Sequence, residues 1–343
     1  MAFKKRGRRS FLTSTAPVIS SWASIAGKKE GEGPLGKTFD RVYTNTTLGQ
    51  KTWEESETSL QSMALEALLE KSGMEARDID VVYSGDLLNQ CIGSSFCLRG
   101  TGMPSLGLYG ACSTMAQSML LAAMTVDGGF AKRAVAMTSS HFAAAERQYR
   151  FPLCYGGQRP PTAQWTVTGS GAVLVGGDYG PRIEACTIGT ALDLGITDAN
   201  DMGAAMAPAA ADTIFTHLTD LDRKPEDYDL IVTGDLGLHG KELALELLRR
   251  SGILAHERLD DCGCMIYDLE RQDVHSGGSG CGCSAVVLCG YLLNQLKAGV
   301  LKRILFCGTG ALLSPVSSQQ SRPIPGICHA VAITAPEVTP WTI

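Results

Sequence analysis

Cys112 is the residue of this sequence whose surroundings best suit chemistry. It lies in GLYGACSTMAQSMLLA, residues 107–122, where small residues lead into a long apolar segment. A helix that begins just after Cys112 would direct free N–H groups and the positive end of its dipole at the sulfur. We therefore expect a lowered thiol pKa, which suits a nucleophile or an anion-binding pocket. A small buried thiol without a special role is the alternative.

Arginines and aromatic residues are dense in a second stretch, TSSHFAAAERQYRFPLCYGGQRP at residues 138–160. It follows an apolar segment typical of a buried strand, and side chains at the carboxyl end of such a strand commonly line a pocket. Arginine forks bind carboxylates, and aromatic rings form apolar walls. The candidate ligand contacts here are His141, Arg147, Arg150 and Tyr155. Each arginine could instead pair with a surface carboxylate such as Glu146.

Asp86 and Asn89 lie in SGDLLNQ, directly after another apolar segment. Ligands bind outside the carboxyl ends of parallel strands, so these two side chains could contribute to the same pocket. Turn capping by Asp and Asn is an equally good explanation. A carboxylate such as Asp86 would also suit a ligand that carries calcium, because calcium prefers oxygen ligands.

The elements that position these residues occur twice in the chain. Residues 64–86 and 213–235 both have the pattern of an amphipathic helix, a charged turn and an apolar strand ending on Gly-Asp. Residues 110–141 and 280–311 both have a small-residue turn, a buried helix, a turn with a Lys-Arg pair and an apolar strand. Such self-similarity predicts duplicated α/β domains that pack with pseudo-symmetry.

The expected boundary between the two halves lies in GGDYGPRIEA, which divides a domain of residues 1–180 from one of residues 181–343. The helices expected at 114–127 and 284–298 are apolar on nearly every side and must be buried between sheets. Apolar strands such as RAVAMTSS fit a sheet that is covered on both faces. The sequence therefore predicts a five-layered α-β-α-β-α sandwich.

Composition excludes several classes of function. The 343-residue chain has a net charge of −5, which gives no electrostatic basis for binding nucleic acid. Its one basic cluster, Lys4 to Arg9, indicates a solvated terminus or a weak attraction to an anionic membrane surface. No apolar run is long enough for a transmembrane helix, and no secretory h-region is present. The twelve cysteines form no C-x-x-C, so they predict reduced thiols of an intracellular protein rather than metal ligands.

A duplicated fold with a cysteine at the mouth of a buried helix resembles the thiolase superfamily. Across residues 30–330, the stretches EGPLGKTFD, SGDLLNQ, GACST, TSSHFAAAERQYRFP, DLGITDANDMGAAMAPAAADTI and TGALLSP more closely resemble the stage V sporulation protein AD family. That resemblance implies a thiolase-like protein that binds dipicolinic acid during its uptake into the developing bacterial spore. It also implies a peripheral position at the spore inner membrane, beside membrane subunits encoded by the same operon.

The resemblance also bears on catalysis. In thiolases and ketoacyl synthases a cysteine at the Cys112 position attacks an acyl group, assisted by a histidine and by an asparagine or second histidine. Here the first histidine position falls at Gly234-Asp235, and the loop 276–284 that should hold the second contains neither residue type. His239 comes five residues late, and His275 immediately precedes the loop. The resemblance therefore implies a binding pocket rather than an enzyme.

Two alternatives stay open: an acyl-transfer or condensing enzyme that uses Cys112, and a purely structural subunit. The pocket interpretation implies no cofactor, apart from calcium if it accompanies dipicolinic acid. Thiolase-like proteins commonly dimerise by pairing edge strands, and AVAMTSS, residues 134–140, is the strand expected at the dyad. We therefore expect a homodimer.

Overall fold

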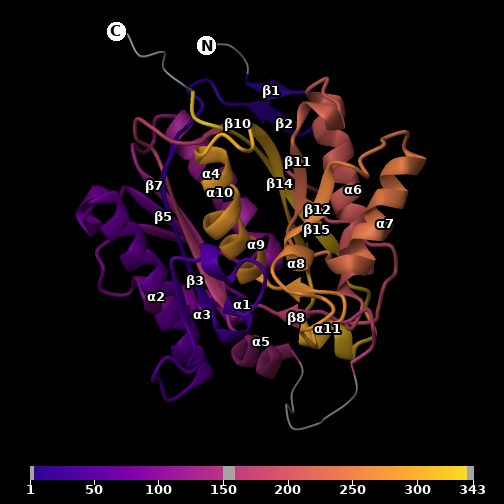
Figure 1. The fold of residues 1–343 in the computed structure, drawn as a ribbon, viewed down its shortest axis with the longest axis horizontal. Helices are drawn as coiled ribbons and strands as arrows, with labels where there is room; N and C mark the ends of the chain where they lie inside the picture. Colours follow the sequence, from indigo (N-terminus) through magenta and orange to yellow (C-terminus); the bar gives the residue numbers. More distant parts are fainter. Residues whose placement is uncertain (1–3, 150–158, 338–343) are drawn as a thin grey trace.

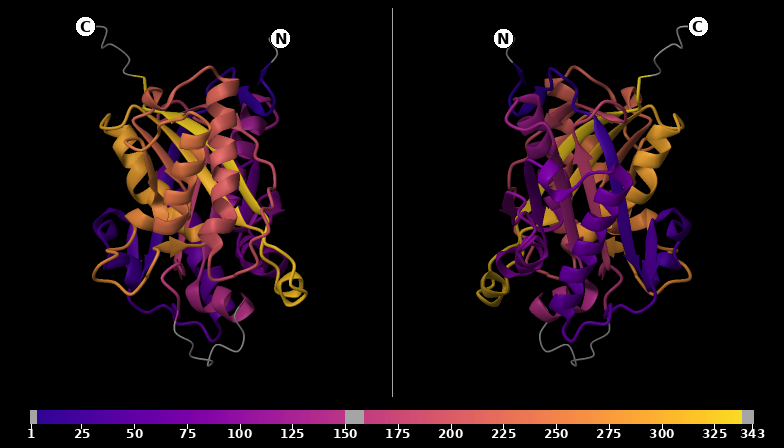
Figure 2. Two further views of the ribbon diagram at one scale, coloured as in Figure 1. Left: turned by 90° about the vertical axis from the view of Figure 1, so that its right-hand side faces the viewer. Right: turned by 90° about the vertical axis from the view of Figure 1, so that its left-hand side faces the viewer.

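Two β-sheets with a layer of helices between them form the centre of the molecule (Figure 1). The computed structural model describes residues 4–149 and 159–337. One sheet has the strand order β4-β3-β9-β7-β5-β6, and the other has the order β1-β2-β10-β15-β14-β11-β12. Further helices cover the outer face of each sheet (Figure 2). This α-β-α-β-α order of layers confirms the predicted fold class.

The strands divide between the two sheets and one short pair. The first sheet contains β3 (Ile19–Gly27), β4 (Arg41–Tyr43), β5 (Val81–Gly85), β6 (Ser105–Leu108), β7 (Ala134–Ser140) and β9 (Gly169–Val175). The second contains β1 (Lys5–Arg6), β2 (Ser10–Leu12), β10 (Arg182–Thr187), β11 (Leu230–Thr233), β12 (Leu259–Asp261), β14 (Arg303–Ala311) and β15 (Gly326–Thr334). The short parallel pair joins β8 (Trp165–Thr166) to β13 (Gly278–Ser279).

The helices divide among three layers and the connecting segments. On the side of the first sheet lie α1 (Lys28–Gly31), α2 (Trp53–Ser72), α3 (Ile92–Leu98) and α5 (Phe142–Tyr149). The central layer contains α4 (Thr114–Asp127), α9 (Cys281–Val287) and α10 (Leu293–Lys297). On the side of the second sheet lie α6 (Met202–Asp220), α7 (Gly237–Arg250), α8 (Cys262–Met265) and α11 (Pro315–Gln319).

The duplication predicted from the sequence appears in the strand pairing. The order β3-β9-β7-β5-β6 is repeated as β10-β15-β14-β11-β12, with the first two pairings antiparallel and the last two parallel in each sheet. Equivalent aspartates fix equivalent turns. Asp80 accepts from the backbone N–H groups of Lys132 and Arg133 at 2.7 and 2.9 Å. Asp229 accepts from those of Lys302 and Arg303 at 2.6 and 3.0 Å.

The position of the domain boundary, residues 1–180 against 181–343, stays a prediction. It falls in the turn between β9 and β10, where the chain passes from the first sheet to the second. The start of the chain crosses this division, because β1 and β2 add to the edge of the second sheet beside β10.

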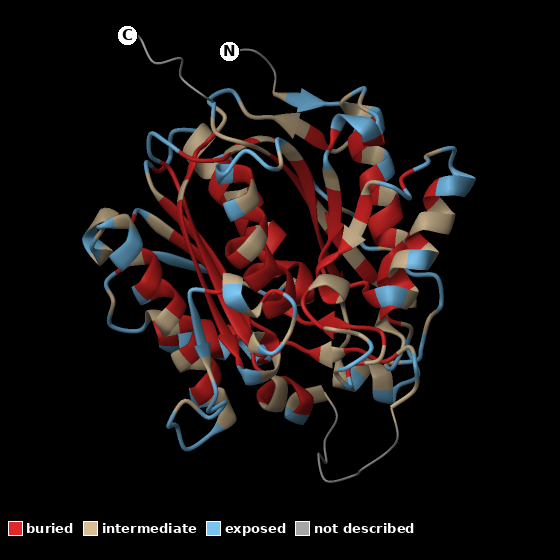
Figure 3. Ribbon diagram, viewed as in Figure 1, coloured by how far each residue is buried: buried red, intermediate tan, exposed pale blue. Residues whose placement is uncertain are grey.

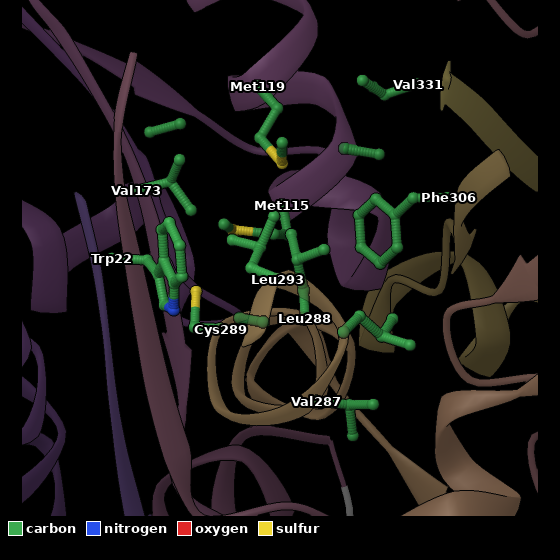
Figure 4. Packing of buried hydrophobic residues seen from close by; sticks show 14 of the residues in the cluster. Trp22, Met115, Met119, Val173, Val287, Leu288, Cys289, Leu293, Phe306 and Val331 are labelled. Carbon is green, nitrogen blue, oxygen red and sulfur yellow. The ribbon is translucent and has the colours of Figure 1, made fainter. Parts of the chain in front are cut away.

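Apolar side chains hold the central helices between the sheets. Met115 and Met119 of α4 meet Leu288 and Leu293, and all four are inaccessible to water (Figure 4). Figure 3 shows the parts of this layer that lie between the sheets as buried, with exposed stretches toward one end of the helices. Fully burying one such side chain stabilises the fold by about 1.5–3 kcal/mol. The predicted burial holds for most of residues 114–123 and 284–293, whereas Met124, Asn294 and Lys297 are exposed. Residues 288–292 form a π-turn that separates α9 from α10.

The basic cluster at the start of the chain is an ordered hairpin of β1 and β2, although the side chains of Lys5, Arg6 and Arg8 are exposed to solvent. Asp220 accepts from the backbone N–H groups of Arg8 and Arg9, each at 2.9 Å. Lys4 Nζ lies 2.7 Å from Asp127 at the end of α4. Carboxylates of two helices therefore fix the hairpin to the body of the molecule.

The strand expected at a dyad, residues 134–140, is β7, and it lies inside the first sheet. Its two neighbours are β9 and β5. The expectation that this strand pairs with a second copy is therefore wrong, because it has no free edge. The edge strands of the first sheet are β4 and β6, and Leu106 of β6 is 57% exposed. An uncovered edge strand is a template for pairing with another chain.

We expect the chain to dimerise by antiparallel pairing of β6 with the β6 of a second copy. Sedimentation velocity at micromolar concentration should then give the mass of two chains. Leu106→Lys places a charge at the edge and should shift the population toward monomer. Leu194→Lys, at a residue that is 67% exposed on another part of the surface, is the matched control. A wild-type monomer at that concentration would contradict the dimer.

Candidate functional site

Cys112 lies in a short turn between β6 and the buried helix α4. The turn is the 3₁₀ segment Ala111–Ser113, and α4 begins at Thr114. Ala111 has a φ of +51°, a left-handed conformation that a residue with a side chain seldom adopts. Backbone strain of this kind clusters at functional sites. Here it holds Cys112 at the N-terminal end of the helix.

A cavity that both halves of the chain build opens beside Cys112. It contains about 570 Å³ of empty space, including its mouth. The first half lines it with Leu87, Cys112, Ala145, Glu146, Tyr149 and Thr166. The second half contributes Ala199, Met202, Ser279, Ala311 and Leu313. Mostly apolar walls with a few polar atoms are typical of a site for a small molecule.

The thiol of Cys112 is not activated in the way that its position suggested. Burial raises its pKa well above the ordinary value, and the negative charge of Asp235 raises it further. The expected lowering of the pKa is therefore wrong. The helix N-terminus is in place, but loss of water and a buried carboxylate outweigh it. The thiol stays protonated at neutral pH, and a protonated thiol is a poor nucleophile.

Asp235 is the buried carboxylate that determines the state of this thiol. Thr309 Oγ1 donates to its Oδ1 at 2.7 Å, and Ser279 Oγ and the Gly280 N–H donate to its Oδ2 at 3.1 and 2.9 Å. Burial raises the pKa of Asp235, whereas these donors and the Cys112 thiol lower it. The network joins the end of β11, the strand β14 and the loop before α9.

The positions of the catalytic partners hold other residues or face elsewhere. Asp235 follows β11, where the thiolase resemblance places the first histidine. The Nε2 of His239, in the first turn of α7, is 3.4 Å from the Oδ2 of Asp201. The Nε2 of His275 is 3.1 Å from the Oδ1 of Asp273. Neither histidine lines the cavity.

His141, expected at the ligand, is buried against the backbone instead. Its Nε2 donates to the carbonyl oxygen of Thr46 at 2.7 Å, and its Nδ1 accepts from the Ala144 N–H at 3.4 Å. Burial lowers the pKa of His141, which keeps the ring neutral. These contacts fix the start of α5.

Arg147 and Asn89 line a second, separate hollow on the surface. Arg147 forms an ion pair with Glu54, and its guanidinium carbon is 5.4 Å from the centre of the Trp53 ring. The Oδ1 of Asn89 accepts from the Tyr109 hydroxyl at 3.2 Å. A carboxylate already neutralises this arginine, as the surface ion-pair alternative requires, although its partner is not Glu146.

The expected convergence of Cys112, His141 and Arg147 in one cavity is therefore wrong. Helix phase gives the reason: Ala145 and Tyr149 are one turn apart on the face of α5 that lines the cavity, and Arg147 lies midway between them on the opposite face. Of the other predicted contacts, Arg150 and Tyr155 lie outside the described residues.

Asp86 is fully buried and caps the local backbone. Its Oδ2 accepts from the N–H and the hydroxyl of Ser94, each at 2.7 Å, and its Oδ1 accepts from the Leu88 N–H at 2.9 Å. Burial raises the pKa of Asp86. These contacts fit the capping alternative, and Asp86 does not line the cavity.

Tyr149, one of the aromatic residues that the 138–160 stretch offered as an apolar wall, lines the cavity. Glu146 lines it too, although the sequence suggested only an ion-pair partner for an arginine. The Tyr149 hydroxyl donates to the carbonyl oxygen of Leu87 at 2.8 Å. Glu146 accepts from the Thr166 hydroxyl at 3.1 Å. The four-residue spacing from Ala145 to Tyr149 could have predicted the face of α5 that turns inward. No local signal marks Asp235, which reaches Cys112 only through the packing of the two halves.

Two further properties follow from the described ranges. No helix within residues 4–149 and 159–337 combines the length and the apolar character needed to cross a membrane. The cysteines in these ranges, including Cys112 and Cys281, are free thiols.

Comparison with known proteins assigns the chain to a family. The profile of Stage V sporulation protein AD (SpoVAD) matches residues 7–334. The chain belongs to the stage V sporulation protein AD family. The Stage V sporulation protein AD of Bacillus subtilis (strain 168) is 46% identical over 329 residues, which cover 96% of this chain and 97% of the relative. The resemblance noted in the sequence is thus confirmed across nearly the whole chain.

Solved structures with the same architecture come from condensing enzymes. Cerulenin-bound OleA of Xanthomonas campestris has a TM-score of 0.60 at 13% identity, covering 93% of this chain and 97% of that one. AbyA1, a tetronic acid condensing enzyme, has a TM-score of 0.57 at 18% identity and covers 93% and 99%. The 3-oxoacyl-[acyl-carrier-protein] synthase III of Aquifex aeolicus VF5 has a TM-score of 0.53 at 13% identity, with 93% and 99% covered. At these identities the likeness shows that this SpoVAD family member has a thiolase-like fold.

Asp235→Asn should make Cys112 react faster with iodoacetamide, because removing the neighbouring negative charge lowers the thiol pKa. We expect a rate increase of at least about tenfold at pH 8, which corresponds to one pKa unit. Mass spectrometry of the Cys112 peptide from the native protein measures the rate. Asp193→Asn, at an exposed carboxylate, is the control and should change nothing. Wild-type alkylation at the rate of the unfolded chain would contradict a protonated, buried thiol.

Proposed function

We propose that the cavity beside Cys112 binds dipicolinic acid for uptake into the developing spore, without catalysing a reaction on it. Membership of the stage V sporulation protein AD family supports a role in sporulation. The ligand itself comes from what the family resemblance implies. The observation that carries the proposal is a mostly apolar cavity whose cysteine is kept protonated by burial and by the charge of Asp235.

The walls of the cavity suit a flat aromatic ring. Leu87 and Tyr149 line it from the first half of the chain, and Met202 and Leu313 line it from the second. A pyridine ring buried there would gain apolar contact on its faces and leave its carboxylates to the polar atoms.

Two carboxylates need positive partners, and α4 supplies one. The 14-residue helix begins beside Cys112, and its N-terminal N–H groups and dipole favour a negative charge. The second carboxylate of dipicolinic acid needs a cation beside it as well. Arg150 directly follows Tyr149 in the sequence and is the partner that we propose. Calcium chelated by dipicolinic acid would serve the same purpose.

The surroundings of Cys112 also support our proposal that the chain does not catalyse a reaction. A thiol nucleophile needs a group that removes its proton, and Asp235 instead raises the thiol pKa. The segment before α9 presents Ser279 and Gly280 to Asp235, where an enzyme of this kind needs a histidine or asparagine. Loss of acid–base and oxyanion partners costs several orders of magnitude in rate.

The cellular setting that we propose also follows the family resemblance. The chain would act at the spore inner membrane, together with membrane subunits encoded by the same operon. A binding protein that delivers its ligand to such subunits needs a reversible site rather than a covalent one, and a protonated Cys112 suits that requirement.

Arg150→Ala should weaken dipicolinic acid binding by about one to two decades, the usual cost of a lost charge-assisted contact. Isothermal titration calorimetry of the purified chain, with and without calcium, measures the affinity. Arg147→Ala is the matched control, because Glu54 already neutralises Arg147 in a separate hollow. Equal weakening by both substitutions would contradict the proposed contact, and no binding by the wild-type chain would contradict the function.

Cys112→Ala should weaken binding by less than about tenfold, because the thiol contributes shape but no full charge. Cys112→Trp should abolish binding by filling the cavity while it leaves the thermal midpoint near that of the wild type. The same variants decide the enzymatic alternative when they are assayed with acyl-CoA substrates. An acyl-transfer activity of the wild type that Cys112→Ala removes would show that the chain is an enzyme.

A further inference from the structure

The end of the molecule opposite the Cys112 cavity brings four basic segments together. They are residues 4–9 of the hairpin and the turns 127–133, 176–182 and 297–303, here named the basic pole. Strand pairing places the turns at one end: Ala134 pairs with Val175, and Arg182 and Arg303 both pair with Thr334. A bridge from Val18 to Arg182 joins the two sheets there. Figure 1 shows this end at the top and α5 at the bottom.

Each turn of the basic pole exposes one large apolar side chain. Phe130 is 88% exposed, Tyr179 is 62% exposed and Val300 is 68% exposed. Exposure of such an apolar side chain to water is unfavourable. In each turn a basic residue lies within three positions after the apolar residue. The basic residues are Lys132, Arg182 and Lys302, in that order along the chain.

Two of these turns are copies of each other from the duplicated halves. The sequence Phe-Ala-Lys-Arg at 130–133 corresponds to Val-Leu-Lys-Arg at 300–303. Asp80 and Asp229 hold the two Lys-Arg backbones in the same way, by accepting from both N–H groups. Both halves of the molecule therefore present an apolar residue and a lysine at the same end.

The charge of the basic pole is opposite to that of the whole chain. Its four segments contain eleven basic and two acidic residues, in a chain with a net charge of −5. Five carboxylates from elsewhere in the described chain accept hydrogen bonds from these segments, namely Asp80, Asp212, Asp220, Asp229 and Glu184. Within this set of contacts, basic residues outnumber carboxylates, with eleven basic residues against two internal and five external carboxylates.

We propose that the basic pole docks on a lipid bilayer that contains anionic headgroups. Phe130, Tyr179 and Val300 enter the headgroup region, and the lysines and arginines beside them contact the phosphates. The arrangement favours a bilayer over a protein partner. The centre of a protein interface is depleted of charge, whereas here each apolar side chain has a cation within three residues.

The proposal has a geometric consequence for the site. The helix α4 begins beside Cys112 and ends at Asp127, whose carboxylate binds Lys4 of the basic pole. The cavity and the basic pole therefore lie at opposite ends of this helix, and docking turns the cavity mouth away from the bilayer. Antiparallel pairing of β6 would turn the two poles of a dimer to opposite sides. One protomer of each dimer would then contact a given bilayer.

Co-sedimentation of the full chain with vesicles tests the proposal. The vesicles contain equal parts of phosphatidylglycerol and phosphatidylcholine, or phosphatidylcholine alone. We expect binding to the anionic vesicles only, with an affinity that falls as salt is added. The double variant Lys132→Glu with Lys302→Glu should weaken binding by at least about tenfold. The double variant Phe130→Ser with Val300→Ser should weaken it by at least about fivefold.

Matched controls lie at the cavity end, where Leu194 is 67% exposed and Lys51 precedes α2. Leu194→Ser and Lys51→Glu should leave vesicle binding unchanged. Equal binding to neutral vesicles, or equal losses in pole and control variants, would overturn the proposal. An unchanged affinity of the Phe130→Ser, Val300→Ser variant would show that no apolar group inserts. Binding to soluble polyglutamate but not to vesicles would identify an acidic polypeptide as the occupant and also overturn it.

Discussion

The burial of the central helical layer is the constraint on which the rest of the structure depends. Met115 and Met119 of α4 are inaccessible to water, because the two sheets enclose them together with Leu288 and Leu293. Enclosure fixes both ends of α4. One end carries Cys112 into the cavity, and the other carries Asp127 to the hairpin at the start of the chain. The packing of α4 between the sheets thus positions both the cavity and the hairpin.

A helix N-terminus and a cysteine are not sufficient for a nucleophile. The turn geometry by itself favours a thiolate, but burial and, after it, the negative charge of Asp235 raise the pKa of the Cys112 thiol. The carboxylate is in turn stabilised by Thr309, Ser279 and the Gly280 N–H. Charge placed in the second half of the chain therefore decides the chemistry of a residue in the first.

The sequence was sufficient for the fold because its signals are local and repeated. An apolar helix at 114–127 and strands that end on Gly-Asp carry their periodicity in a few consecutive residues. The order of the strands in a sheet depends on contacts between distant segments. Nothing in residues 134–140 therefore shows that β7 pairs with β5 on one side and with β9 on the other. The candidate site was only partly predictable for the same reason. Cys112 lines the cavity as expected, whereas the phase of α5 turns Arg147 away from it.

Asp235 also couples the cavity to the proton concentration of its surroundings. Burial already raises the pKa of this carboxyl group, and a negative ligand placed beside it raises the pKa further. By thermodynamic reciprocity, protonation of Asp235 must then tighten the binding of that ligand to the same degree. If the anion that we propose binds next to Asp235, its affinity would therefore be higher in acid than in alkali. The residue that helps to raise the pKa of the Cys112 thiol would then also make binding of that ligand depend on pH.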